Sequence, residues 1–133
     1  MANDQAPMTN HAIQKERVFD LAERIAAFGE NAVHFSTTIR RDAVTMPLIS
    51  QFVRSSTSIG ANYLEADEAG SKKEFRYRIS VCRREARETK NWLRMLVAAS
   101  PEIAEPARKL WQEAREFVLI LESIHRKAAA MPK

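Results

Sequence analysis

The chain has 133 residues, enough for one domain with its own core, and its 45% hydrophobic content excludes a disordered protein. The single cysteine, Cys82, excludes a disulfide framework and favours a reducing, cytoplasmic location. No apolar run approaches the roughly 20 residues that span a bilayer, so no membrane partner is expected. The net charge of +4 permits an acidic partner without requiring one.

Residues 1–15 lack the apolar segment of a signal peptide. We expect them to form a flexible tail that precedes a bundle domain of residues 16–130. A first helix is predicted over residues 16–39, because its apolar residues recur at three- and four-residue steps. This spacing turns charged residues such as Arg24 away from the apolar side. The apolar stripe consists of Val18, Leu21, Ile25, Phe28, Ala32, Phe35 and Ile39.

A second helix is predicted from Pro47, which suits a first turn, to residue 69, with Gly70 as its stop. Its central stretch, Arg54–Ala66, is rich in small residues that let neighbouring helices approach closely. A glycine within a helix costs roughly 1 kcal/mol against alanine, so a compensating gain is expected at Gly60. We expect Asn62 and Tyr63 to make specific polar contacts; the alternative is a plain bundle helix with some serines. The apolar face of this helix carries Phe52, Ser56, Ile59 and Tyr63.

The segment Ser71–Glu74 has the pattern of a capping box, which predicts a third helix that continues to about residue 98. Cys82 falls within the apolar stripe of this helix and is expected to be a small core residue, not a nucleophile. The other members of the stripe are Phe75, Ile79, Ala86, Leu93 and Val97, with Trp92 alongside.

The pair Ser100–Pro101 ends the third helix, and a fourth is predicted to start at Glu105 or Pro106. Its near-heptad pattern comprises Ala107, Leu110, Ala114, Phe117, Leu121, Ile124 and Ala128. Trp111, Val118 and Ile120 widen the apolar surface, as expected if a second neighbour, such as another subunit, packs there. Four helices joined by short loops predict an all-α, antiparallel up-down-up-down four-helix bundle.

The third helix carries nine basic and three acidic residues between Lys72 and Arg94, so the rest of the chain is slightly acidic. Such a surface fits a phosphate backbone, either RNA or DNA, with little sequence preference. The alternative is a solvated face partly neutralised by Glu74, Glu88 and neighbouring helices. No aromatic residue interleaves the basic ones, so base stacking is not expected. The candidate nucleic-acid-binding residues are Lys73, Arg76, Arg83, Arg84, Arg87, Lys90 and Arg94.

Catalytic patterns are weak, and we expect neither an enzyme nor a cofactor. Glu122 and His125 have the spacing of a di-iron ligand pair, which leaves a metal-binding bundle or small enzyme as the alternative. Such a site needs a second copy of the pair, and the sequence has none. Asn62, Glu65 and Glu85 are interpreted as inward-facing polar residues with structural contacts.

Three segments, Arg54–Ala66, Ser71–Phe75 and Arg84–Leu93, closely resemble the 23S rRNA intervening-sequence protein family. The resemblance implies a bundle that assembles as a homopentamer, with no assigned biochemical function. A related branch, the accessory proteins of diversity-generating retroelements, binds nucleic acid and a reverse transcriptase, which makes these candidate partners here. The motif residues implied to serve fold and assembly are Arg54, Ser58, Gly60, Asn62, Tyr63, Glu65, Glu85 and Trp92.

Overall fold

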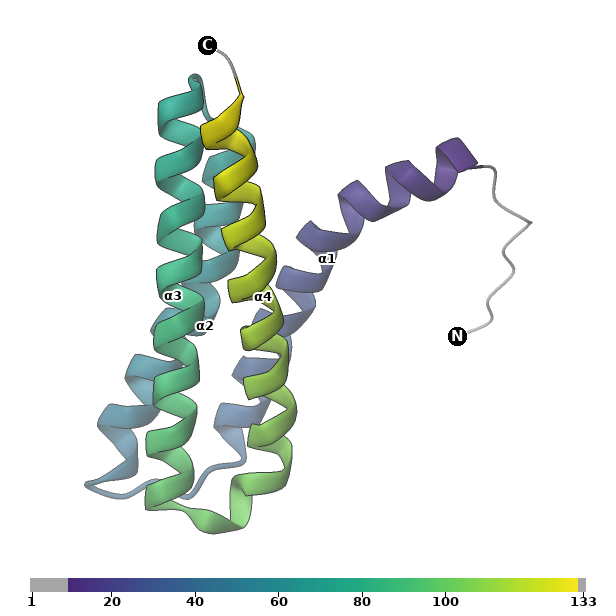
Figure 1. The fold of residues 1–133 in the computed structure, drawn as a ribbon. Helices are drawn as coiled ribbons and strands as arrows, with labels where there is room; N and C mark the ends of the chain where they lie inside the picture. The colour runs from purple at the N-terminus through teal and green to yellow at the C-terminus, as the bar shows by residue number, and fades with distance from the viewer. Residues whose placement is uncertain (1–9, 132–133) are drawn as a thin grey trace.

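The computed structural model describes residues 10–131, and the side chains of residues 21–131. Within this range the chain forms helices and no strand. The predicted all-α, up-down-up-down four-helix bundle is confirmed, since consecutive helices run in opposite directions (Figure 1). The elements are α1 (Asn10–Thr37), α2 (Thr45–Asp67), α3 (Lys72–Ala99), the short 3₁₀ helix η1 (Pro101–Ile103) and α4 (Ala104–Ala130).

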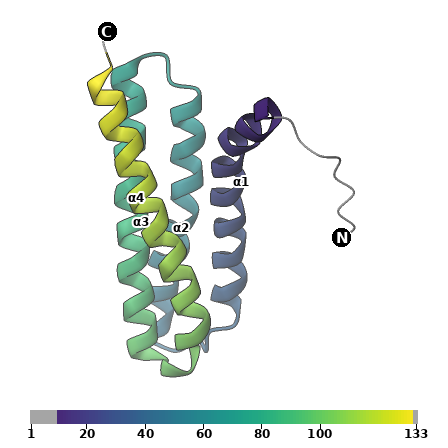
Figure 2. The same cartoon turned by 45° about the vertical axis from the view of Figure 1, so that its right-hand side comes forward.

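Helices α2, α3 and α4 lie side by side, whereas the first turns of α1 lead away from them (Figures 1 and 2). The second half of α1 packs against α2 and α4. Asn10–Lys15, which we assigned to the tail, belongs to α1, and the remainder of that predicted tail lies outside the described residues. The part of the chain that the structure describes contains no helix long and apolar enough to cross a membrane.

Aromatic side chains from three helices form the centre of the core. Phe28 of α1 meets Phe117 of α4 edge-on, with ring centroids 5.3 Å apart, and Phe35 meets Phe52 of α2 at 5.7 Å. Such edge-to-face pairs add to the free energy gained by burying the rings. The predicted apolar stripes of α2, α3 and α4 face this core, as do the members of the α1 stripe whose side chains are described.

The helix ends depend on caps that the sequence patterns identify only in part. Ser71 caps α3 as predicted, since its Oγ accepts from the backbone N–H of Glu74 at 3.1 Å. The Glu74 carboxylate accepts from the N–H of Gly70, one residue earlier than a regular capping box would have it. Asp42 Oδ1 accepts from the N–H groups of Val44 and Thr45, and these bonds are the main reason that the pKa of Asp42 is lowered.

Helix α2 ends at Asp67, two residues before the predicted end. None of the three glycines has a positive φ, so Gly70 does not form the left-handed stop that we expected. Instead, the N–H of Glu68 bonds to the carbonyl of Leu64, and the N–H of Ala69 bonds to that of Ala66. The chain therefore leaves α2 through a tightened last turn that any residue can adopt.

Candidate nucleic-acid interface

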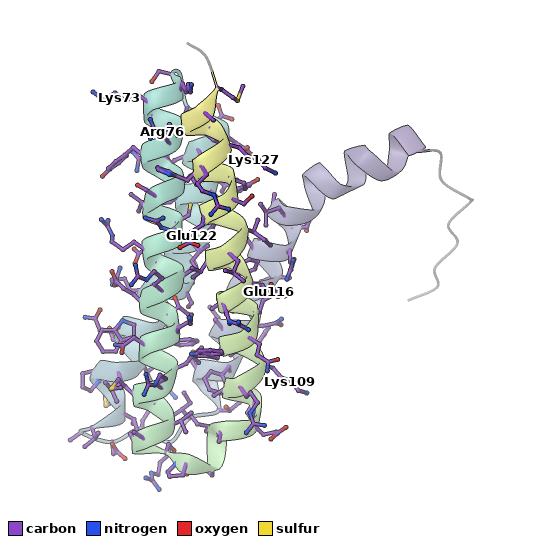
Figure 3. The ribbon with its side chains drawn as sticks, viewed as in Figure 1. Lys73, Arg76, Lys109, Glu116, Glu122 and Lys127 are labelled. Carbon is purple, nitrogen blue, oxygen red and sulfur yellow. The ribbon has the colours of Figure 1, made fainter. Side chains whose placement is uncertain are left out.

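Helix α3 exposes most of its predicted basic residues, but they do not form one narrow row. Lys73, Arg84, Arg87 and Arg94 are exposed, while Arg76, Arg83 and Lys90 are partly buried. Lys73 points away from α4 (Figure 3), so the row nearest α4 excludes it. The helical repeat places Arg76, Arg83, Arg87, Lys90 and Arg94 on the side of α3 next to α4.

The acidic residues of α3 are engaged elsewhere. Arg54 of α2 binds Glu85 at 3.1 Å and Glu88 at 2.8 Å. The hydrogen bond to Glu85 is the main reason that the pKa of Arg54 is raised. Glu74 is used in the α3 cap. Among the described side chains these carboxylates form no ion pair with the basic residues of their own helix, so Glu74 and Glu88 do not pair directly with them. Neutralisation by neighbouring helices, the other part of the alternative, is not tested by these contacts.

Within the described part of the chain, the basic side chains of α3 form no ion pair with an acidic residue. Among residues 21–131, where side chains are described, none of the seven candidate side chains forms an ion pair. Burial lowers the pKa of His125 on α4, and the nearby charges of Arg76 and Arg83 lower it further. These neighbours repel a metal cation at His125. In the same range no three His, Cys, Asp or Glu side chains gather as metal ligands would.

Helix α4 adds a second basic row that the sequence analysis missed. Arg108, Arg115 and Arg126 are exposed and share one side of α4 by helical spacing. Arg108 and Arg94 line the same groove, which places this row beside α3. Figure 3 shows Lys109 and Glu116 on the side of α4 that faces away from α3. We call the two rows together the α3/α4 basic surface: Arg76, Arg83, Arg87, Lys90 and Arg94 with Arg108, Arg115 and Arg126.

An aromatic ring of the neighbouring helix lies within this surface, which our expectation for the basic residues of α3 alone did not include. Trp111 of α4 lies beside α3, and Lys90 Nζ is 4.7 Å from the centroid of its ring. Trp111 also lines a hollow of about 420 Å³ between the two helices. The other residues lining the hollow are Leu93, Arg94, Val97, Ala104, Ala107 and Arg108. The sequence of α3 alone could not show this ring, because it belongs to the neighbouring helix.

The residues of the central α2 stretch have mixed placements. Asn62 makes the polar contacts expected of it: its Nδ2 donates to the carbonyl of Ser58 at 2.9 Å, and its Oδ1 accepts from Arg78 at 3.3 Å. Tyr63 packs against the core, and among the described residues its hydroxyl has no hydrogen-bond partner. Its pKa is raised, chiefly by burial. Glu65 is exposed, which corrects the inward placement we expected.

Small residues bring α2 and α3 together, as predicted. The buried hydroxyl of Thr89 donates to that of Ser55 at 2.9 Å, and the Cys82 thiol donates to the carbonyl of Ile59 at 3.5 Å. Burial raises the pKa of Cys82 to about 12. Cys82 is thus a core residue, as expected, and its thiol stays protonated at neutral pH. Trp92 also packs against the core.

Two other expectations, one for Arg24 and one for Gly60, are revised. Arg24 does not face away from the bundle: it binds Glu113 of α4 through two hydrogen bonds of 2.7 and 2.8 Å. Gly60 faces α1, but a Cβ added there would be 3.5 Å from Ile25 Cγ2, an ordinary contact distance. The packing of one subunit therefore does not require a glycine at residue 60.

These features define an all-α four-helix bundle with one basic surface that crosses two antiparallel helices. The family model described as "23S rRNA-intervening sequence protein" matches residues 18–123, and the chain belongs to that family. A solved structure from Bacteroides thetaiotaomicron, described as a protein of unknown function from the S23 ribosomal protein family, is similar. Its sequence is 27% identical, the match covers 78% of this chain and 96% of that one, and the TM-score is 0.68. No curated protein matches the sequence.

Proposed function

We propose that this protein is a non-enzymatic, homo-oligomeric module that binds nucleic acid through the α3/α4 basic surface. The observation that carries the proposal is the absence of acidic partners for the α3 cations within the described part of the chain. Glu85 and Glu88 lie on the α2 side of α3, where Arg54 binds both. On the α4 side the eight basic residues of the surface outnumber Glu122, the carboxylate of α4 that Figure 3 shows between the two helices. A surface of this kind attracts an extended polyanion.

The length and residue types of the surface fit a phosphate backbone. From Arg76 to Arg94 the row on α3 extends about 27 Å, the rise of eighteen helical residues, which matches roughly eight phosphates of one strand. Arginine dominates both rows, and its planar guanidinium binds phosphate oxygens through paired hydrogen bonds. Phosphate contacts carry no base information, so these contacts alone give little sequence specificity.

The α1–α2 side of the bundle supports assembly. Here a shallow groove of about 360 Å³ is lined largely by small residues, and Val33 at its edge is exposed. Small side chains allow a helix of a neighbouring subunit to approach closely. The small residues of the groove are Ala26, Gly29, Ser56, Thr57 and Gly60. The pentameric number comes from the family resemblance. Repeating the basic surface around a ring would convert weak contacts of one subunit into useful avidity.

A charge-matched pair of variants tests the proposal. Arg87→Glu with Arg94→Glu reverses two exposed charges on the α3/α4 basic surface. Lys109→Glu with Lys127→Glu makes the same change in net charge at two exposed residues of α4 that lie outside this surface. Binding to a fluorescent RNA or DNA strand at low salt should be lost in the first variant and largely kept in the second. Equal effects would show that only net charge matters, and a wild-type protein that binds neither strand would refute the proposal.

A further inference from the structure

The hollow beside Trp111 combines three features that a phosphate-binding surface does not need. It has an aromatic wall, aliphatic sides from Leu93 and Val97, and a cationic rim of Arg94 and Arg108. It exists because α4 presents Ala104 and Ala107 where larger residues would fill the space against α3. No carboxylate lines it, so its charge favours an anionic ligand with an apolar, flat portion.

We infer that the Trp111 hollow receives one unpaired base of a single-stranded nucleic acid whose phosphates lie on Arg94 and Arg108. This inference rests on the proposed function and adds to it the class of nucleic acid. A volume of about 420 Å³ is within the range of small-molecule sites and accommodates a planar base. Stacking on an aromatic side chain tolerates every base, because each base has a π-face.

Lys90 links the hollow to the basic row. Its ammonium lies over one face of the Trp111 ring, 4.7 Å from the centroid, in a cation–π contact, and a base that stacks on that face takes its place. A strand running along α3 from Arg87 to Arg94 passes the edge of the hollow. A base that leaves the strand there reaches the ring while the flanking phosphates stay on the arginines. Duplex DNA keeps its bases paired and stacked, so it gains only the phosphate contacts.

The experiment compares three labelled ligands of equal length by fluorescence anisotropy at low salt: a single strand, the same backbone with abasic residues, and a duplex. Wild type should bind the single strand about 5- to 150-fold more tightly than the abasic strand, the range expected for one stacked base. Trp111→Leu should reduce single-strand binding to the abasic level and leave abasic and duplex binding unchanged. Tyr77→Leu is the control, because Tyr77 is an exposed aromatic residue that contacts Arg78 and does not line the hollow.

Ala104→Leu is a second variant, which fills the hollow and keeps Trp111. It should cause the same selective loss, and circular dichroism will show that both variants are folded. If wild type binds all three ligands equally, or Trp111→Leu and Ala104→Leu bind as wild type does, the hollow takes no base, although the proposed function stands. If light scattering shows that either variant changes the particle mass, the hollow belongs to a subunit interface and the inference is wrong. Failure to bind any of the ligands would refute the proposed function itself.

Discussion

Replacing Gly29 and Gly60 with alanine, one at a time, distinguishes the packing of a single subunit from that of an assembly. A Cβ at Gly29 meets no atom within 4 Å, and one at Gly60 meets only Ile25 Cγ2 at 3.5 Å. Both glycines lie inside helices, so each alanine should stabilise an isolated subunit by about 0.8–1 kcal/mol through helix propensity. For a domain of this size, such a gain raises the melting temperature by about 3–6 °C.

The two glycines line the groove in which we place a neighbouring subunit. If that groove is covered in the assembly, the added methyl groups will meet the neighbour, and the variants will form smaller particles or lose the thermal gain. Thermal unfolding followed by circular dichroism measures the stability, and light scattering measures the particle mass. Gly70→Ala, outside the helices and without a positive φ, is the control and should change neither.

Two results would contradict this reasoning. If Gly60→Ala is destabilised while wild type and variant are both monomeric, the added methyl group does not fit beside Ile25 as the structure indicates. If both variants are stabilised and the assembled mass is unchanged, the α1–α2 groove is not the surface on which subunits meet.

Three further predictions follow from individual side chains. Arg54→Gln should destabilise the fold by about 1–2 kcal/mol in chemical denaturation, because Glu85 is only 8% exposed and loses its charged partner. A loss of stability well below about 1 kcal/mol, as is usual for an exposed ion pair, would contradict this. Cys82, with a pKa of about 12, should react with a thiol reagent at neutral pH only when denaturant unfolds the chain, and rapid labelling of folded protein would disprove its burial. The pKa of His125 is lowered on folding, so the unfolded chain binds more protons and stability should fall as pH drops below about 6.5, the ordinary histidine pKa. His125→Gln should remove this part of the pH dependence, and identical pH profiles for variant and wild type would refute it.

The fold could be predicted because its signals are local. Apolar residues at three- and four-residue steps specify which side of each helix is buried, and Ser71 marks a helix start through a bond to a residue three positions away. The end of α2 was placed less accurately, because Gly70 suggested a left-handed stop that the backbone does not use. The role of Asp42 at the start of α2 was missed, although an aspartate three residues before Thr45 is a recognisable capping signal.

The candidate site could be predicted only where it lies on one helix. The basic residues of α3 are evident from sequence. The ion pairs of Glu85 and Glu88 with Arg54 are not, because they join α3 to α2. Likewise, the seven-residue spacing of Arg108 and Arg115 is visible in the sequence, yet it does not say which helix they lie beside. The register of α3 against α4 is set by packing of the core, and it alone brings Trp111 next to Lys90.

The most direct test of nucleic-acid binding is the salt dependence of affinity for a single-stranded oligonucleotide. Each phosphate contact contributes about −0.7 to the slope of log affinity against log salt for single strands, so five contacts on one α3 row give about −3.5. Replacing Arg87 and Arg94 with glutamate should make this slope shallower by at least about 1.4 per subunit, while the Lys109 and Lys127 variant keeps the wild-type slope. A wild-type affinity that does not change with salt, or no binding at the lowest salt, would contradict the account.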